Sequence, residues 1–365
     1  MTDKIEEIGT INSIPVRNIW LLMLYASDLF RQINNIDQVS AEENPDQIPD
    51  LIAEILCHHV QYRVKRNLSY GYQSRQDILN RVRGRIAILE TERRQLTSRG
   101  KIACRFDELI VDTDRNRFVR NALEKISRIV QADSLAQKSR SLAVNLKRMG
   151  VTGDYSRVNQ GAINSFGRHD LIDKPMVSAA QLAFNLALPT ENSGSKHLTS
   201  PDKENDWVRK LYEKGVAGFY DVMLSDHGWL VQAGKTIDWI IESKSSGIDK
   251  ILPSMRTDII LDQPVKNRRI VIDTKFNSVV VPGWHRDRTL RSSYIYQIYS
   301  YLRSQEDDTD PLSQNSAGLL LHPSMGEMVN EFVTIQGHEI RFATVDLGGQ
   351  AHQIRSQLLE VIGET

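Results

Sequence analysis

The chain has 365 residues, which is long enough for two domains that each bury their own core. Basic and acidic residues both total 46, so no global charge draws the protein onto nucleic acid. Cys57 and Cys104 are too few for a zinc site or a disulfide framework, which favours a reducing, cytoplasmic location. The longest apolar run, residues 19–26, is too short to span a bilayer, and no secretory signal pattern follows Met1. We therefore expect no association with a membrane.

Hydrophobic periodicity predicts a mostly helical first half. Residues 14–30, 51–66, 116–131 and 135–149 carry apolar side chains at helical spacing. The acidic, proline-containing stretch 35–50 is predicted to be a loop.

A strongly basic segment interrupts these helices. Residues 68–88 are predicted to form a hairpin or another extended excursion. Between residues 61 and 101, eleven basic side chains are opposed by only three acidic ones. Such a patch could hold the phosphates of nucleic acid, hold an acidic protein surface, or be the solvated face of a helix. The candidate contact residues in it are Arg75, Arg81, Arg83 and Arg85.

The second half begins after a polar stretch, residues 191–203, which is predicted to be a linker. A helix over 205–223 then opens a second domain, in which 317–321 and 340–345 are further strand candidates. The predicted domains are therefore residues 1–190 and 204–365.

The most informative feature is a pair of short apolar segments separated by a turn-like stretch, 257–261 and 269–275. If the turn is centred between residues 265 and 266, Asp258 lies directly opposite Asp273. Cross-strand Cβ atoms are about 5 Å apart, so one divalent ion could touch both carboxylates. Lys275 is two residues beyond Asp273, and side-chain alternation places it on the same face.

Two acids and a lysine on one sheet face are typical of a metal-dependent phosphodiesterase. Mg²⁺ takes oxygen ligands, lowers the pKa of a bound water and neutralises charge on the scissile phosphate. A lysine can orient the attacking hydroxide and stabilise the transition state. The alternative is that Asp258 and Asp273 are solvated strand residues. Against it, Asp273 interrupts an Ile-Val-Ile run that has the composition of a buried strand.

A predicted amphipathic helix over 289–303 follows this hairpin. Beside its apolar stripe, Tyr294, Gln297 and Tyr301 line up at i, i+3 and i+7. The order of a D-x-K strand, a loop and a Gln-x-x-x-Tyr helix resembles one branch of the PD-(D/E)XK nuclease superfamily. In that branch the glutamine and tyrosine help to position the site and the nucleic acid. Thr257 stands where the superfamily's proline would be, and the alternative is a helix whose polar flank only covers the sheet.

The chain as a whole resembles McrC, the nuclease subunit family of the McrBC modification-dependent restriction systems. The similarity runs nearly from end to end, and the joint order of short motifs is more specific than any one of them. The motifs are Ile14-Pro15-Val16-Arg17-Asn18-Ile19-Trp20, Leu24-Tyr25-Ala26, Gly84-Arg85-Ile86, Phe106-Asp107-Glu108-Leu109, Asp112-Thr113, Asn116-Arg117, Leu211-Tyr212-Glu213-Lys214, Arg256-Thr257-Asp258-Ile259, Ile272-Asp273-Thr274-Lys275, Tyr296-Gln297 and Tyr301-Leu302.

This resemblance implies an α+β protein. Its mostly helical N-terminal domain, with a β-rich excursion, would dock on a hexameric AAA+ GTPase of the McrB type and stimulate its hydrolysis. An α/β PD-(D/E)XK domain with a central mixed sheet flanked by helices would then cleave double-stranded DNA containing methylcytosine. The chain has no G-x-x-x-x-G-K-[ST] phosphate loop, which fits this division of labour. The basic stretch 63–101 is the candidate ring-penetrating element.

The resemblance also implies a third acidic metal ligand on the helix that opens the nuclease fold. Glu213 is the candidate by its context, and Glu204 is the reserve. Helical geometry places Glu213 roughly 100° or more from the centre of the apolar face, so a solvated Glu213 is the alternative. The predicted catalytic set is Asp258, Asp273, Lys275, Gln297 and Tyr301, with Mg²⁺ held by Asp258, Asp273 and Glu213.

Two other functional classes stay open. A stand-alone PD-(D/E)XK repair nuclease would not need a large N-terminal domain that matches McrC. A non-catalytic regulator of an AAA+ ATPase would not need an intact acid–acid–lysine set.

Overall fold

A computed structural model describes residues 10–33, 35–154, 159–168, 170–194, 201–283, 287–324 and 326–364. The chain forms two compact units. One unit combines Met1–Ile48 with Leu188–Thr365, and the other is Pro49–Ala187. This division differs from the predicted boundary, because the first 48 residues group with the C-terminal half. The predicted linker, residues 191–203, is helical in its described parts, since helix α8 continues to Gly194 and helix α9 begins at Pro201.

The Pro49–Ala187 unit has a helical body, as predicted. Its helices are α3 (Ile48–Lys65), α5 (Asp114–Ile126), α6 (Asp133–Arg148), α7 (Gln160–Ile163) and α8 (Lys174–Gly194). Thr113 begins α5 as its N-cap, because its hydroxyl accepts a hydrogen bond from the Asn116 amide. Apolar side chains on α3 and α5, including Leu56, Phe118 and Leu123, are fully buried in the core of this unit.

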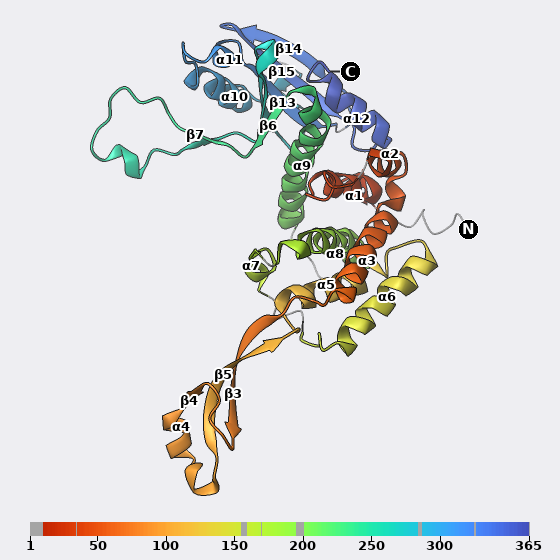
Figure 1. The fold of residues 1–365 in the computed structure, drawn as a ribbon. Helices are drawn as coiled ribbons and strands as arrows, with labels where there is room; N and C mark the ends of the chain where they lie inside the picture. Colours follow the sequence, from red (N-terminus) through yellow and green to blue (C-terminus); the bar gives the residue numbers. More distant parts are fainter. Residues whose placement is uncertain are drawn as a thin grey trace. The chain divides into compact units, whose positions relative to one another are not determined.

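A β-arm projects from this helical body (Figure 1). Strands β3 (Gly71–Leu79) and β5 (Ile102–Ile110) pair antiparallel over their whole length, and β4 (Arg85–Ile86) adds to the other edge of β5. Helix α4 (Ile88–Arg93) completes the arm. The predicted excursion at 68–88 is therefore confirmed, but its main strand pairs with residues 102–110, which were not predicted to be a strand.

The other unit is built around a six-stranded mixed sheet in the order β14-β15-β13-β10-β9-β6. Strand β13 runs parallel to β10 and β15, and the other pairings are antiparallel. The strands are β6 (Leu230–Ala233), β9 (Ile259–Gln263), β10 (Arg268–Thr274), β13 (Ala317–Pro323), β14 (Asn330–Ile335) and β15 (His338–Val345).

Buried side chains cover both faces of this sheet. Ile260, Val271 and Leu320 pack in one cluster with Ile298 and Leu302 of helix α10 (Ser292–Ser304). Their neighbours along the strands point to the opposite face and are also buried, as with Ile259, Ile272 and Leu321. The predicted strands at 317–321 and 340–345 and the predicted helix at 289–303 are thereby confirmed.

Helix α1 (Val16–Tyr25) packs against helix α9 (Pro201–Leu224) in this unit. The backbones approach so closely that a Cβ atom built at Gly218 would lie 1.9 Å from the Tyr25 carbonyl oxygen. Asn18 anchors α1 at the other side, where its amide nitrogen donates 2.6 Å to the Leu347 carbonyl. The N-terminal segment is therefore an integral part of the unit that contains the six-stranded sheet.

The loop predicted at 35–50 is wrong, because helix α2 (Asn35–Glu43) and a short 3₁₀ helix (Pro45–Gln47) lie there. Tertiary contacts stabilise this acidic helix. The Tyr25 hydroxyl donates a 3.0 Å hydrogen bond to the buried Glu42 carboxylate, which also pairs with Arg355 at 2.7 Å. Arg355 belongs to helix α12 (Ala351–Glu360).

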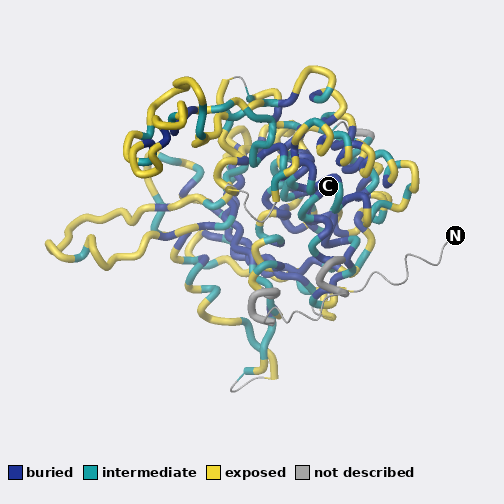
Figure 2. Tube along the Cα trace, turned by 90° about the horizontal axis from the view of Figure 1, so that it is seen from below, coloured by how far each residue is buried: buried dark blue, intermediate teal, exposed yellow. Residues whose placement is uncertain are grey.

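The remaining elements are short. A long excursion between β7 (Thr236–Ile237) and β8 (Met255–Arg256) is largely exposed (Figure 2). Strands β1 (Thr10–Ile11), β2 (Ile14–Pro15), β11 (Val280–Val281) and β12 (Thr289–Leu290) and helix α11 (Pro311–Gln314) complete the described fold. In the described residues, no helix combines the length and apolarity needed to cross a membrane.

Candidate active site

The predicted hairpin register is the observed one. Strands β9 and β10 pair Ile259 with Ile272, so the next position outward places Asp258 opposite Asp273. The turn contains a 3₁₀ helix over Pro264–Lys266 and closes with Asn267 at φ 48°, a left-handed conformation that asparagine tolerates well. The apolar strands and their turn residues therefore bring the two carboxylates to the same end of the hairpin.

Asp258 is held against the end of β10. Its Oδ2 accepts two hydrogen bonds from Thr274, one from the backbone amide and one from the hydroxyl, both 2.7 Å long. Sequence reasoning missed this role of Thr274. Its position between Asp273 and Lys275, on the strand opposite Asp258, is the signal that could have found it.

Asp273 is 2% exposed and lies beside Lys275, whose Nζ is 2.7 Å from the Asp273 Oδ2. Burial raises the pKa of Asp273 to about 6, although the Lys275 ammonium acts in the opposite direction. The negative charges of Asp258 and Glu213 raise it further. A carboxylate in this setting is stabilised by an additional positive charge, which is what a bound cation supplies.

Lys275 is oriented by helix α10. Its Nζ donates a 3.0 Å hydrogen bond to the Gln297 Oε1, and the Gln297 Nε2 donates 2.7 Å to the Tyr301 hydroxyl. The ammonium also lies 4.7 Å from the ring centroid of Tyr294. Tyr294, Gln297 and Tyr301 were predicted to share one side of this helix. Tyr294 and Gln297 contact Lys275, and Tyr301 contacts Gln297.

Glu213 of α9 belongs to the same electrostatic cluster. Its side chain is half-buried, and burial together with the Asp258 charge raises the pKa of Glu213. Glu213 and Asp258 line one cavity. Glu213 is therefore not a freely solvated residue on the outer surface of the helix. The side chain of Glu204, the reserve candidate, lies outside the described residues.

The donor set fits a hard cation. The oxygens of Asp258, Asp273 and Glu213 are the ligand type that Mg²⁺ prefers, and Mg²⁺ commonly uses one or two carboxylates with several waters. Within the described part of the chain, no group of three or more His, Cys, Asp or Glu side chains is close enough together to hold a metal ion by itself.

The predicted contact arginines lie elsewhere, on the β-arm of the Pro49–Ala187 unit. Arg75 pairs with Glu108 at 2.5 Å, and Arg83 stacks 4.0 Å from the Phe106 ring centroid. Between Arg83 and Arg85, Gly84 adopts φ 67°, where a Cβ atom would lie 2.3 Å from the Arg105 carbonyl oxygen. The Gly84-Arg85-Ile86 motif thus serves a close backbone approach in the arm.

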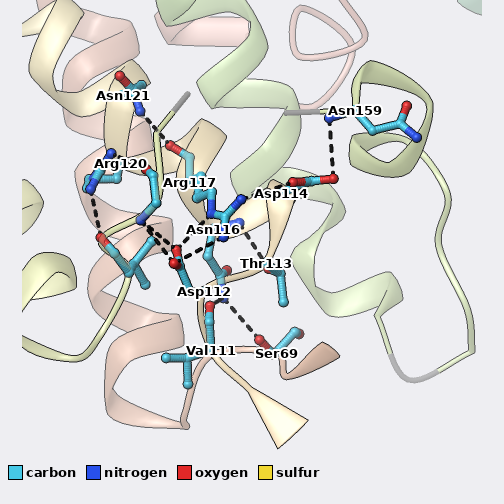
Figure 3. Close-up of polar contacts among 12 residues, drawn as sticks. Ser69, Val111, Asp112, Thr113, Asp114, Asn116, Arg117, Arg120, Asn121 and Asn159 are labelled. Carbon is cyan, nitrogen blue, oxygen red and sulfur yellow. Dashed lines mark hydrogen bonds and ion pairs between the residues drawn. The ribbon is translucent and has the colours of Figure 1, made fainter. Parts of the chain in front are cut away.

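A polar network fixes the base of this arm (Figure 3). Asn116 donates hydrogen bonds to the carbonyls of Ser69 (3.0 Å) and Val111 (2.8 Å), which flank the two long strands. Asp112 accepts hydrogen bonds from Arg117 (2.9 Å) and from the Gly153 amide (3.0 Å). Burial acts in the opposite direction, but these hydrogen bonds hold the pKa of Asp112 below its ordinary value. The motif residues Asp112, Asn116 and Arg117 therefore anchor the arm to the helical body.

Comparison with known proteins agrees with these features. A family model described as "McrBC 5-methylcytosine restriction system component" matches residues 3–171 and 208–321. The curated relative "Type IV methyl-directed restriction enzyme EcoKMcrBC" of Escherichia coli (strain K12) is 25% identical over 353 residues. The match covers 96% of this chain and 98% of that relative.

Two solved structures show only weak likeness. The first is described as a half-complex from the tetradecameric assembly of Thermococcus gammatolerans McrB AAA+ hexamers with bound McrC. It gives a TM-score of 0.43 at 14% identity and covers 95% of this chain and 76% of that chain. The second, the Thermococcus gammatolerans McrBC complex, gives 0.35 at 14% identity and covers 53% and 63% of the two chains. Such low scores carry no argument about the fold.

The fold and the site define an α+β protein with a carboxylate–lysine centre on a mixed sheet. The family model matches well over half of the chain. The chain therefore belongs to the McrBC 5-methylcytosine restriction system component family.

Proposed function

We propose that this chain is the Mg²⁺-dependent DNA endonuclease subunit of an McrBC-like complex, with a nuclease domain of the PD-(D/E)XK type. The observation that carries the proposal is the pairing of Asp258 with Asp273 beside Lys275, whose ammonium is held by Gln297. Asp258, Asp273 and Glu213 would hold the ion. A divalent ion in this position supplies charge neutralisation at the scissile phosphate and a more acidic water.

The chain's own residues supply orientation and positive charge. Lys275 would donate a hydrogen bond to a phosphate oxygen or to the attacking water, because its ammonium retains one donor beyond the two directed at Asp273 and Gln297. Tyr301 accepts the Gln297 amide hydrogen and so fixes which Gln297 atom faces the lysine. Thr274 fixes the rotamer of Asp258.

A partner would direct this activity to its substrate. The related assemblies are described as McrB AAA+ hexamers with bound McrC, and the E. coli relative as methyl-directed. We propose that an AAA+ GTPase of the McrB type selects double-stranded DNA containing methylcytosine, in defence against foreign DNA. The β-arm, with Arg75, Arg81, Arg83 and Arg85, would engage the partner ring and stimulate hydrolysis.

Single substitutions at the site test the catalytic assignment. Asp258→Ala, Asp273→Ala and Lys275→Ala should each abolish cleavage of methylated DNA by the complex with partner, nucleotide and Mg²⁺. Partner binding and circular dichroism should be unchanged, because the substitutions remove no apolar core side chain. Asp249→Ala is the matched control, since this acid of the same unit lies on the exposed excursion and pairs with Lys244. Cleavage by the purified Asp273→Ala complex at the wild-type rate would disprove the assignment.

A further inference from the structure

The candidate site has a wall that the nuclease-like strands do not supply. A cavity of about 230 Å³ adjoins Asp258 and Glu213. Residues 25–28 and Arg31, at the end of helix α1 and just after it, also line this cavity, as does Lys214 of α9. Residues far apart in the sequence therefore line one cavity, with two candidate metal ligands and two cationic side chains.

This wall is fixed in place. A Cβ atom at Gly215 would lie 3.1 Å from the Leu22 carbonyl oxygen and one at Gly218 would clash with Tyr25, so α1 and α9 pack with their backbones nearly in contact. Arg31 forms an ion pair with Asp221 of α9, which holds the guanidinium at the rim of the cavity. Its side chain is 56% exposed, so it remains open to a ligand.

The charged side chains that line the cavity determine the conditions under which an anion can bind there. Asp28, Glu213, Asp221 and Asp258 contribute four carboxylates, and only Arg31 and Lys214 oppose them. The cavity is therefore net negative by itself and repels phosphate. One divalent ion at the Asp258 end would balance this charge, leaving the two cations at the other end available for a polyanion.

We propose that Arg31 and Lys214 form a DNA-phosphate subsite, which binds the backbone next to the scissile phosphate once a divalent cation is present. An arginine forks onto phosphate oxygens with two parallel hydrogen bonds, and a lysine adds a point charge. The inference rests on the proposed nuclease function, because it takes Asp258 and Glu213 as the reacting end of the cavity. It makes the N-terminal segment part of the substrate-binding surface.

The test uses the full chain in complex with its AAA+ partner, nucleotide and a methylated duplex. Arg31→Ala and Lys214→Ala should each raise KM roughly five- to tenfold and leave kcat within about twofold, because a phosphate contact away from the scissile bond contributes to binding. DNA affinity, measured by anisotropy in Ca²⁺, should lose about one unit of salt dependence per substitution. Arg31→Lys should recover part of the affinity.

Arg209→Ala is the matched control. Arg209 lies on α9, the helix that carries Lys214, and its side chain is about as exposed as that of Arg31. It pairs with Asp206 and does not line the cavity. Its KM and salt dependence should equal the wild-type values. If Arg31→Ala fails to fold because Asp221 loses its partner, Lys214→Ala still tests the phosphate subsite, since it leaves the Arg31–Asp221 ion pair intact.

Unchanged KM and salt dependence in both Arg31→Ala and Lys214→Ala, with cleavage still abolished by Asp273→Ala, would overturn the subsite and leave the nuclease assignment standing. A fall in kcat at constant KM would also overturn it. Cleavage that persists in Asp273→Ala would instead refute the proposed function itself.

Discussion

At the scale of single residues, Asp273 illustrates the stability cost of a buried carboxylate. Its carboxylate is buried in a strand of apolar residues, and its pKa is raised to about 6 from an ordinary value near 4. The folded state therefore binds this proton more tightly than the unfolded state does. The free energy of unfolding should fall as pH rises from about 4 to about 6, on the order of 2–3 kcal/mol in total.

Asp273→Asn should remove this pH dependence. Because the amide carries no charge to desolvate, the variant should be more stable than the wild type at pH 7 without metal, by up to about 2 kcal/mol. Mg²⁺ should raise the melting temperature of the wild type and not of the variant, since binding to the native state adds to its stability. Melts from pH 4 to pH 7 with EDTA or Mg²⁺ measure both effects. Parallel pH profiles for the two proteins would contradict the assignment of Asp273.

At the scale of secondary-structure elements, the parts predicted from sequence are those specified by local pattern. The hairpin register followed from two apolar strands and one turn. The helical period predicted that Tyr294, Gln297 and Tyr301 share one side of the helix, and the structure brings that side to Lys275. Helix α2 was missed because its composition is acidic and its stability comes from distant partners of Glu42, namely Tyr25 and Arg355. A local sequence pattern does not predict such long-range contacts.

The β-arm is the element with the clearest functional test. Its arginines are mostly exposed, while Asp112, Asn116 and Arg117 anchor its base, so charge can be changed on the arm without disturbing its attachment. Charge reversal of Arg81, Arg83 and Arg85 together should reduce partner-stimulated NTP hydrolysis and complex assembly. The NTPase rate and the amount of complex formed measure this effect directly.

The alternative role of the arm gives a different result with the same triple variant. If the arm holds DNA phosphates instead, hydrolysis stays near the wild-type rate, and the salt dependence of DNA binding falls by about one unit per lost contact. Reversal of Arg209, outside the arm, controls for the effect of reversing a single exposed arginine. Normal hydrolysis and normal assembly would rule out the ring-binding role.

At the scale of the whole molecule, the order of the two units along the sequence determines which segments build the candidate site. The Pro49–Ala187 unit is inserted between Ile48 and Leu188, so the unit that contains the six-stranded sheet is discontinuous in sequence. A boundary near residue 190 was predicted because the polar stretch there resembles a linker. The contacts of α1 with α9 join segments far apart in the sequence, which sequence patterns do not reveal. A fragment beginning at residue 204 would lack α1 and with it one wall of the cavity beside Asp258.

We propose above all that this chain is the cutting subunit of a complex driven by a partner. The most direct measurement is cleavage of a methylated duplex in Mg²⁺ by the isolated chain, and by the chain with its AAA+ partner, each with and without nucleotide. We expect double-strand breaks only when the chain, the partner and hydrolysable nucleotide are all present, and no breaks when Asp273→Ala replaces the wild type. Efficient, nucleotide-independent cutting of unmodified duplex by the isolated chain would contradict it and would favour a stand-alone nuclease.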